Sequence, residues 1–287
     1  MSETTPNLEA DHPGSDVKMD TSAKPTFILV HGAWQSSSVW VYVTALLEKA
    51  GYSVYPVTLK SPNVNPAVQD FSADVEVVKD AIESVIESGK DAVLAVHSYA
   101  GIVGCEALKS FHHEMLSVAA EEASEDAAHG DKPIHRRGKV LHLAFIAGLI
   151  YPPGMSLADL DTRPPPGIVQ VGEKGDWVRI MDGDTRMYND LSPEAAGFWN
   201  KKLKLQSRHV FYSELTYPAY RYYPSSYLTC SADQAVLPKT QSRMMMLARI
   251  KQANVVKINA GHSPMISQPG AVAKFLRKAA GEVSSVL

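Results

Sequence analysis

A serine between small residues, Ser98, stands at a predicted strand-to-helix corner. The apolar run 92–94 is typical of a buried strand, and the run 102–108 is typical of a helix. Such a corner sets the serine hydroxyl beside the helix N-terminus, whose unpaired N–H groups stabilise negative charge. The pattern predicts a nucleophile elbow, in which the serine attacks a carbonyl carbon. The usual form is G-x-S-x-G, and the β-branched Val96 at its first position crowds the corner, which could re-aim the serine.

Two further polar residues follow predicted strands later in the chain. Asp233 follows the strand pattern at 227–231, and His262 follows the pattern at 255–258. Because active sites of open parallel sheets lie at the carboxyl ends of the strands, we expect both residues to meet Ser98. A serine hydroxyl needs a base at neutral pH, and an imidazole base needs an acceptor that fixes its tautomer. The predicted catalytic residues are therefore Ser98, His262 as the base and Asp233 as its acceptor.

Each of these residues also has a plainer interpretation. A serine before a helix is often an N-cap, and Ser98 alone would fit that role. Asp233 could cap the following helix, and His262 could be a core or capping histidine. Asp184 and Asp190 stay open as alternative acids, although both fall in a segment predicted to lie over the sheet.

Backbone N–H groups for a tetrahedral oxyanion are expected from two places. One is Tyr99, directly after the candidate nucleophile. The other is the loop after the first predicted strand, where Ala33 is the main candidate and Trp34 the second. Gly32 has no side chain and lets this loop bend close to the serine.

The remaining histidines and the cysteines indicate no metal site. His31 and His97 flank the predicted site, and we expect them to orient backbone rather than transfer protons. Cys105 and Cys230 have no metal-ligand spacing and are expected to be small buried residues. Four histidines lie in an irregular region without ligand spacing: His112, His113, His129 and His135. We expect neither a metal nor an organic cofactor.

Strand and helix patterns alternate along the chain. Strands are predicted at 26–30, 53–59, 91–96, 140–147, 227–231 and 255–258. Helices are predicted at 39–49, 72–88, 102–108, 240–250 and 271–280. This alternation predicts an α/β fold: a mostly parallel central sheet with helices on both faces and right-handed crossovers.

The chain divides into a tail, a core and an insert. Residues 1–24 have almost no large apolar residues and are predicted to be a disordered tail. The core comprises 25–151 and 219–287. Residues 152–218 show no clear strand and are predicted to form a helical cap, inserted after the strand at 140–147.

Aromatic and thioether side chains of the insert have two open interpretations. They either line a substrate pocket under the cap or form the cap's own small core. The candidate substrate contacts, which include two residues outside the insert, are Trp34, Trp177, Met181, Phe198, Trp199 and Met265.

The motifs together resemble the α/β-hydrolase superfamily, closest to the plant methylesterase and hydroxynitrile lyase group and its fungal relatives. They read H-G-A-W at 31–34, H-S-x-x-G at 97–101, Y-L-x-C-x-x-D at 227–233 and H-x-x-M-x-x-x-P at 262–269. The likeness covers about residues 25–283 and implies the α/β-hydrolase fold. Lyases of this group typically have Thr where Gly32 stands and Lys where Ser263 stands. A serine hydroxyl cannot supply the positive charge that departing cyanide needs, so the resemblance favours hydrolysis.

The overall composition is that of an ordinary globular protein. A formal net charge of -3 gives no electrostatic case for nucleic acid or an anionic membrane surface. The acidic stretch 121–128 and the basic cluster 132–139 are interpreted together as a solvated loop. Neither a membrane span nor a secretory signal is recognisable, so a cytoplasmic location is the expectation. The expected partner is a small-molecule substrate, and the oligomeric state stays open.

These observations predict a serine hydrolase that cleaves a small, mostly apolar ester, lactone or thioester through an acyl-enzyme on Ser98. Two alternatives remain. One is a lyase or other non-hydrolytic enzyme of specialised metabolism on the same fold. The other is a catalytically silent protein that binds a small molecule.

Overall fold

The computed structural model describes residues 24–112, 137–159, 169–172 and 174–282. The predicted tail up to residue 23 and the acidic stretch 121–128 lie outside these residues, as does most of the basic cluster 132–139. Three of the four histidines weighed as metal ligands also lie outside: His113, His129 and His135.

Six parallel strands form the central sheet, in the order β2-β1-β3-β4-β8-β9. In that order they span Val54–Val57, Thr26–Val30, Ala92–His97, Val140–Ile146, Ser225–Cys230 and Val255–Ile258. The predicted parallel sheet is confirmed, with strand ends within a few residues of the expected ones.

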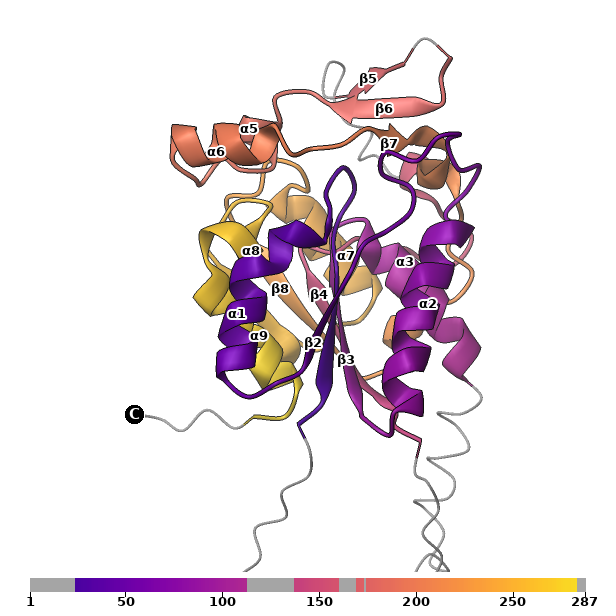
Figure 1. Ribbon diagram of the computed structural model, residues 1–287, viewed down its shortest axis with the longest axis vertical. Helices are drawn as coiled ribbons and strands as arrows, with labels where there is room; N and C mark the ends of the chain where they lie inside the picture. Colours follow the sequence, from indigo (N-terminus) through magenta and orange to yellow (C-terminus); the bar gives the residue numbers. More distant parts are fainter. Residues whose placement is uncertain (1–23, 113–136, 160–168, 173, 283–287) are drawn as a thin grey trace, which may run out of the picture.

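Both faces of this sheet are buried at its centre, which explains why β1 and β3 carry apolar runs, Phe27 to Val30 and Ala92 to Val96, rather than an alternating pattern. In β1, Ile28 and Val30 point into one hydrophobic cluster, whereas Phe27 and Leu29 point into the other. All four side chains are fully buried. Each cluster is closed by helices, so the sheet is the middle of three layers (Figure 1).

Helices cover the sheet from both sides, as predicted. Two helices pack on the Phe27 side: α1 (Val41–Lys49) and α9 (Pro269–Ala279). Three helices pack on the Ile28 side: α2 (Ser72–Glu87), α3 (Ala100–Ala107) and α7 (Pro238–Leu247). Short helical turns complete this part of the chain: η1 (Ser37–Trp40), η2 (Leu108–Phe111), η7 (Gln252–Asn254) and α8 (Pro264–Ser267).

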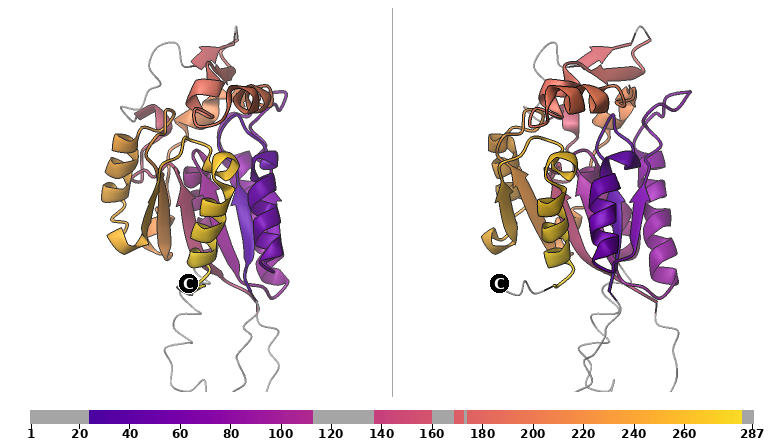
Figure 2. Two further views of the ribbon diagram at one scale, coloured as in Figure 1. Left: turned by 90° about the vertical axis from the view of Figure 1, so that its left-hand side faces the viewer. Right: turned by 60° about the vertical axis from the view of Figure 1, so that its left-hand side comes forward.

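The segment between β4 and β8 lies across the carboxyl end of the sheet (Figures 1 and 2). It contains the helix α6 (Pro193–Asn200) and four helical turns: η4 (Leu157–Asp159), α5 (Gly183–Arg186), η5 (Arg208–Tyr212) and η6 (Ala219–Arg221). It also contains an antiparallel sheet that the sequence interpretation missed: β5 (Val169–Val171), β6 (Trp177–Ile180) and β7 (Gln206–Ser207). With three and two residues, β5 and β7 are too short for a hydrophobic period to identify them, and β6 pairs only with these two strands.

No helix in the described part of the chain has the length and apolarity that crossing a bilayer requires.

Candidate active site

Ser98 occupies a strained corner between β3 and α3. Its φ of 51° lies in the left-handed region, which non-glycine residues rarely adopt. Hydrogen bonds hold the corner: the Ser98 N–H donates to the carbonyl of Ile146 (3.2 Å), and the Ser98 carbonyl accepts from the N–H groups of Gly101 (2.9 Å) and Leu149 (2.8 Å). The structure therefore has the geometry of the predicted elbow.

Two glycines of α3 let neighbouring elements approach this corner. A Cβ on Gly101 would collide with the backbone of Leu149. A Cβ on Gly104 would lie 2.6 Å from Cγ1 of Val96. Gly104, one helical turn after Gly101, thus leaves room for the side chain of Val96. The crowding expected from this β-branched side chain therefore does not displace the elbow.

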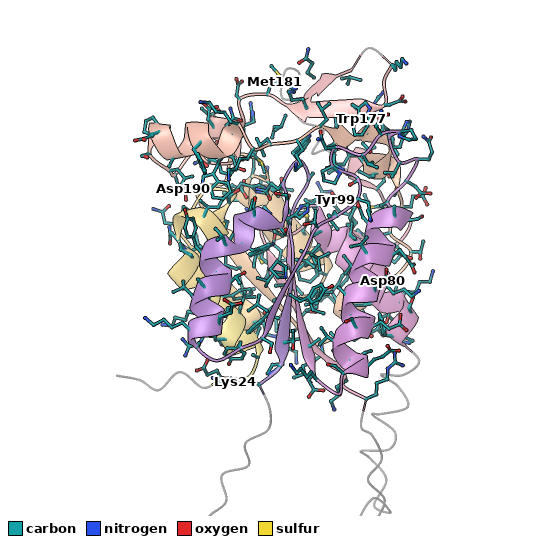
Figure 3. The ribbon with its side chains drawn as sticks, in the orientation of Figure 1. Lys24, Asp80, Tyr99, Trp177, Met181 and Asp190 are labelled. Carbon is teal, nitrogen blue, oxygen red and sulfur yellow. The ribbon has the colours of Figure 1, made fainter. Side chains whose placement is uncertain are left out.

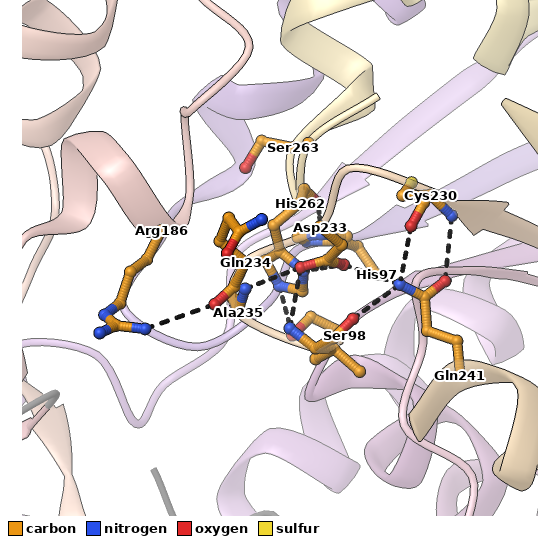
Figure 4. A network of polar contacts seen from close by, with 12 residues as sticks. His97, Ser98, Arg186, Cys230, Asp233, Gln234, Ala235, Gln241, His262 and Ser263 are labelled. Atoms are coloured by element: carbon orange, nitrogen blue, oxygen red, sulfur yellow. Dashed lines mark hydrogen bonds and ion pairs between the residues drawn. The ribbon is translucent and has the colours of Figure 1, made fainter. Parts of the chain in front are cut away.

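The three predicted catalytic side chains form one hydrogen-bonded chain (Figure 4). His262 Nε2 lies 2.9 Å from Ser98 Oγ, and His262 Nδ1 lies 2.8 Å from Asp233 Oδ2. All three are buried, with exposed fractions of 7% for Ser98, 1% for His262 and 0% for Asp233. With Nδ1–H donating to the carboxylate, Nε2 is left as the acceptor for the serine proton.

Asp233 is held by donors from the loop that follows it and from α7. Its Oδ1 accepts from the N–H groups of Ala235 and Val236, both at 2.8 Å. Its Oδ2 accepts from Gln241 Nε2 (2.9 Å) as well as from His262. These bonds stabilise an ionised carboxylate in a buried place. Asp233 does bind backbone at a turn, as the capping interpretation allowed, and it binds the histidine at the same time.

The two alternative acids do not contact the imidazole. Asp184 is exposed and accepts from the N–H of Thr185 (3.0 Å). Asp190 Oδ2 accepts from the N–H of Gly261 (2.7 Å), the residue before His262. Asp190 therefore supports the backbone of the histidine loop, and the geometry favours Asp233 as the acid.

The loop after β1 approaches the serine closely. A Cβ on Gly32 would lie 2.9 Å from Ser98 Cβ, so the absence of a side chain permits this approach without displacement of the neighbours. The N–H of Trp34 donates to Gln206 Oε1 (3.0 Å) and is occupied. Among the described residues, the N–H groups of Ala33 and Tyr99 have no acceptor. This leaves the predicted pair, Ala33 and Tyr99, available for an oxyanion.

Two buried histidines near the site bind backbone, as predicted. His31 Nδ1 donates to the carbonyl of Gly32 (2.8 Å), and its Nε2 accepts from the N–H of Leu59 (3.1 Å). His97 Nε2 donates to the carbonyl of His262 (2.8 Å). Burial lowers the pKa of His31 to about 4 and the pKa of His97 well below its usual value. Neutral His97, whose ring centroid lies 4.8 Å from that of His262, does not repel a cation forming there.

The six candidate substrate contacts lie in different surroundings. Figure 3 shows Trp177 and Met181 on the insert, above Tyr99. Met181 is 37% exposed and Phe198 is 53% exposed, and the Phe198 ring packs against Lys202. Two further candidates are buried in the hydrophobic cluster on the Phe27 side of the sheet: Trp199 and Met265.

Only Trp34 among these candidates connects to the residues around Ser98 through described ring contacts. Its ring lies 5.5 Å from that of Phe211, and Phe211 lies 6.0 Å from Tyr99. The contacts of Phe198 and Trp199 are with each other and with neighbours of α6 and α1. These contacts favour the interpretation that Phe198 and Trp199 pack the insert rather than line a substrate pocket.

No cluster of His, Cys, Asp and Glu suited to a metal ion occurs among the described residues. Both cysteines are buried, as predicted, and burial raises the pKa of the Cys105 thiol to about 12. Of the four histidines weighed as metal ligands, His112 lies in the described part of the chain, and its Nδ1 is hydrogen-bonded to the hydroxyl of Tyr217.

A family model, described as the alpha/beta hydrolase family, matches residues 27–275. The chain belongs to the alpha/beta hydrolase family. The alpha/beta hydrolase nvfD of Aspergillus novofumigatus is 30% identical over 271 residues, covering 92% of this chain and 99% of that protein. Methylesterase 17 of Arabidopsis thaliana is 23% identical, covering 91% and 94%. The resemblance to fungal hydrolases and plant methylesterases is confirmed.

Solved structures agree on the fold of this alpha/beta hydrolase. The crystal structure of polyneuridine aldehyde esterase superposes with a TM-score of 0.68 at 18% sequence identity. The match covers 89% of this chain and 99% of that chain. At this level of identity, the likeness concerns the fold alone.

Sequence interpretation missed the residues that support this hydrolase's candidate triad. Gln241 is fully buried, and its amide also bonds the side chain of Thr229 and the backbone of Cys230 and Val236. A signal existed, because Gln241 precedes the buried Met244 by three residues and so shares its face of the helix. A polar residue on a buried helix face indicates a partner in the core.

Proposed function

We propose that this protein is a serine hydrolase that cleaves a small, mostly apolar ester, lactone or thioester through an acyl-enzyme on Ser98. One observation carries the proposal: the hydrogen-bonded chain from Ser98 through His262 to Asp233 lies beside the unpaired N–H groups of Ala33 and Tyr99. A nucleophile, a base with a fixed tautomer and two oxyanion donors are the parts that acyl transfer requires.

Acylation follows from this geometry. Ser98 Oγ attacks the carbonyl carbon while its proton passes to His262 Nε2, 2.9 Å away. The negative charge that develops on the carbonyl oxygen is stabilised by the N–H groups of Ala33 and Tyr99. Collapse of the tetrahedral intermediate breaks the bond to the leaving group, which takes the proton from His262. An ester or thioester releases it as an alcohol or thiol, whereas the opened lactone keeps it as a hydroxyl group on the acyl chain. Asp233 stabilises the imidazolium during these steps.

Deacylation uses the same groups with water as the nucleophile. His262, neutral again, accepts a proton from the water as the water oxygen attacks the acyl carbon. The second tetrahedral intermediate expels Ser98 Oγ, which takes the proton back from His262. The products are the free acid and the regenerated enzyme.

The substrate class rests on the apolar character of the side chains near these groups. Trp34 and Phe211 are both partly exposed, and we propose them as the surface that an acyl or aromatic group contacts. The name of one similar protein, Methylesterase 17, supports a carboxylic ester as the bond cleaved.

Cyanide-releasing lyase chemistry gains no support from the site. The residue after His262 is Ser263, which is 1% exposed and whose hydroxyl accepts from Gln35 Nε2 at 3.2 Å. A neutral hydroxyl with this partner offers no positive charge to a departing anion.

A substitution at the nucleophile tests the proposed function. With a panel of short-chain and aromatic esters, lactones and thioesters, Ser98→Ala should lower kcat by about 10³-fold or more. Ser242→Ala is the matched control, since this exposed hydroxyl only donates to the carbonyl of Pro238 (2.9 Å), and it should hydrolyse the panel as the wild type does. Turnover that survives Ser98→Ala contradicts the acyl-enzyme.

A further inference from the structure

The backbone of Trp34 is held in place by the segment that lies over the sheet. Its φ of 62° is left-handed, a conformation that a large side chain adopts only when its surroundings impose it. Three hydrogen bonds impose it: the Trp34 N–H donates to Gln206 Oε1 (3.0 Å), its carbonyl accepts from the Lys204 N–H (2.8 Å), and its indole Nε1 donates to the carbonyl of Val178 (3.2 Å). All three partners belong to the insert.

Gln206 continues this contact into the core. Its Nε2 donates to Ser61 Oγ at 2.6 Å, and the Ser61 hydroxyl donates to Asp74 Oδ2. The phenol of Tyr99 donates to the same carboxylate oxygen at 2.9 Å. One hydrogen-bonded path therefore runs from the backbone of Trp34 to the side chain of Tyr99.

Every side chain on this path is removed from water. Gln206, Ser61 and Asp74 are 0% exposed, and Tyr99 is 1% exposed. Asp74 Oδ1 also accepts from the N–H groups of Lys60 (2.7 Å) and Ser61 (2.8 Å). In a buried place each unmade hydrogen bond is costly, so such a network favours one arrangement of the groups that it joins.

The two ends of the path are attached to the two candidate oxyanion donors. The N–H of Trp34 lies in the peptide plane that follows Ala33, and fixing that plane restrains the adjoining plane that carries the Ala33 N–H. At the other end, the phenol anchors Tyr99, whose own N–H is the second donor. An oxyanion hole depends on donors held in position before the reaction.

We propose that Gln206 is a positioning residue for the oxyanion hole, acting through the backbone of Trp34 and through the Ser61–Asp74–Tyr99 path. The inference rests on the proposed function, since it concerns the N–H groups that serve the Ser98 reaction. It assigns a second role to the insert: besides covering the carboxyl end of the sheet, β7 sets the geometry of a catalytic loop that lies 172 residues earlier in the chain.

The test compares ground-state and transition-state binding in Gln206→Met. A misplaced donor weakens binding of the oxyanion more than binding of the substrate. We expect kcat to fall by about 10-fold, less than the loss of roughly 10²-fold or more on deleting a donor, with KM changed by less than about 2-fold. Affinity for a boronic acid, which forms a tetrahedral adduct on serine, should fall by the same factor as kcat.

Ser213→Ala is the matched control. The Ser213 hydroxyl accepts from the N–H of Phe71 at 3.0 Å, so it also joins the insert to the core, without contact to Trp34. This variant should lose thermal stability and keep the wild-type kcat and boronate affinity. If Gln206→Met also only lowers the melting temperature, or raises KM alone, the positioning role is refuted.

A second variant keeps the inference testable if Gln206→Met does not fold. Tyr99→Phe removes the phenol from Asp74 but keeps the ring and the backbone N–H, and it should lower kcat and boronate affinity together by a few-fold. Unchanged values for this variant contradict the inference. Full activity of Ser98→Ala would instead refute the proposed function, so the two failures are distinguishable.

Discussion

Val96 and Gly104 fit together as a large and a small residue across the interface of β3 and α3. A Cβ at position 104 would lie 2.6 Å from Val96 Cγ1, closer than real Cβ contacts come. The helix can therefore pack against a valine at the first position of the elbow, where the common motif has glycine. The elbow keeps its left-handed serine, with a φ of 51° at Ser98.

This pairing predicts that the effect of Gly104→Ala on stability changes sign when Val96 is replaced by alanine. Gly104→Ala should lower the free energy of unfolding by about 1–3 kcal/mol, because the new methyl group overpacks the interface. With Val96→Ala already present, the same change should raise it by about 0.5–1 kcal/mol through helix propensity. Urea unfolding of the four proteins measures both effects. Destabilisation of similar size in both backgrounds would contradict the pairing.

The assignment of the acid predicts a large difference between two aspartates. Asp233→Asn removes the charge that fixes the tautomer of His262 and should lower kcat by roughly 10³- to 10⁴-fold. Asp190→Asn changes a carboxylate that bonds only the backbone next to the histidine and should cost about 10-fold at most. Steady-state kinetics on one activated ester decides. A larger loss of kcat for Asp190→Asn than for Asp233→Asn would indicate that Asp190, in the insert, is the acid that pairs with His262.

The close approach of the oxyanion loop predicts that Gly32 is intolerant of a side chain. The methyl group of Gly32→Ala would press on Ser98 Cβ and His97 Nδ1, each 2.9 Å away, and move the Ala33 N–H from the serine. We expect kcat to fall by about 10- to 100-fold, the scale of a displaced oxyanion donor. Gly197→Ala is the control, because a Cβ there meets nothing within 4 Å. Equal kcat values for the two variants would contradict the claim that a side chain at position 32 displaces the Ala33 N–H.

Burial of His31 predicts a loss of stability in mild acid. Burial lowers the pKa of His31 from 6.5 to about 4, so below about pH 6.5 the unfolded chain binds a proton that the folded chain does not. Stability then falls as the pH drops, by about 2 kcal/mol between about pH 7 and about pH 5 for this one residue. Urea unfolding at both pH values should show a smaller drop for His31→Gln. If the free energy of unfolding falls equally in His31→Gln and in the wild type, His31 is not the source of the pH dependence.

Sequence patterns could identify the strands and the residues at their ends because those signals are local. In β1 the run from Phe27 to Val30 is apolar without alternation, since both faces of the strand are buried. Ser98, Asp233 and His262 follow the strands β3, β8 and β9 of the parallel sheet, and parallel strands bring their carboxyl ends to one edge. This topology lets three residues far apart in the chain be predicted as neighbours.

The supporting residues depend on contacts that no local pattern encodes. Gln206 lies in a two-residue strand, and its partner Trp34 is 172 positions away. Asp74 left a weaker signal: it precedes the buried Val78 by four residues and shares its helix face. That position identifies a buried carboxylate but not its partner Tyr99, because the phenol comes from another element.

The central claim is that Ser98 is an activated nucleophile, and covalent labelling tests it most directly. The folded protein is treated with a fluorophosphonate, which reacts with activated serines, and the modified residue is located by mass spectrometry of its peptides. We predict a single adduct on Ser98, formed far more slowly in His262→Ala and absent in urea-unfolded protein. An unmodified Ser98 in the folded protein, or labelling that does not depend on His262, would contradict the account.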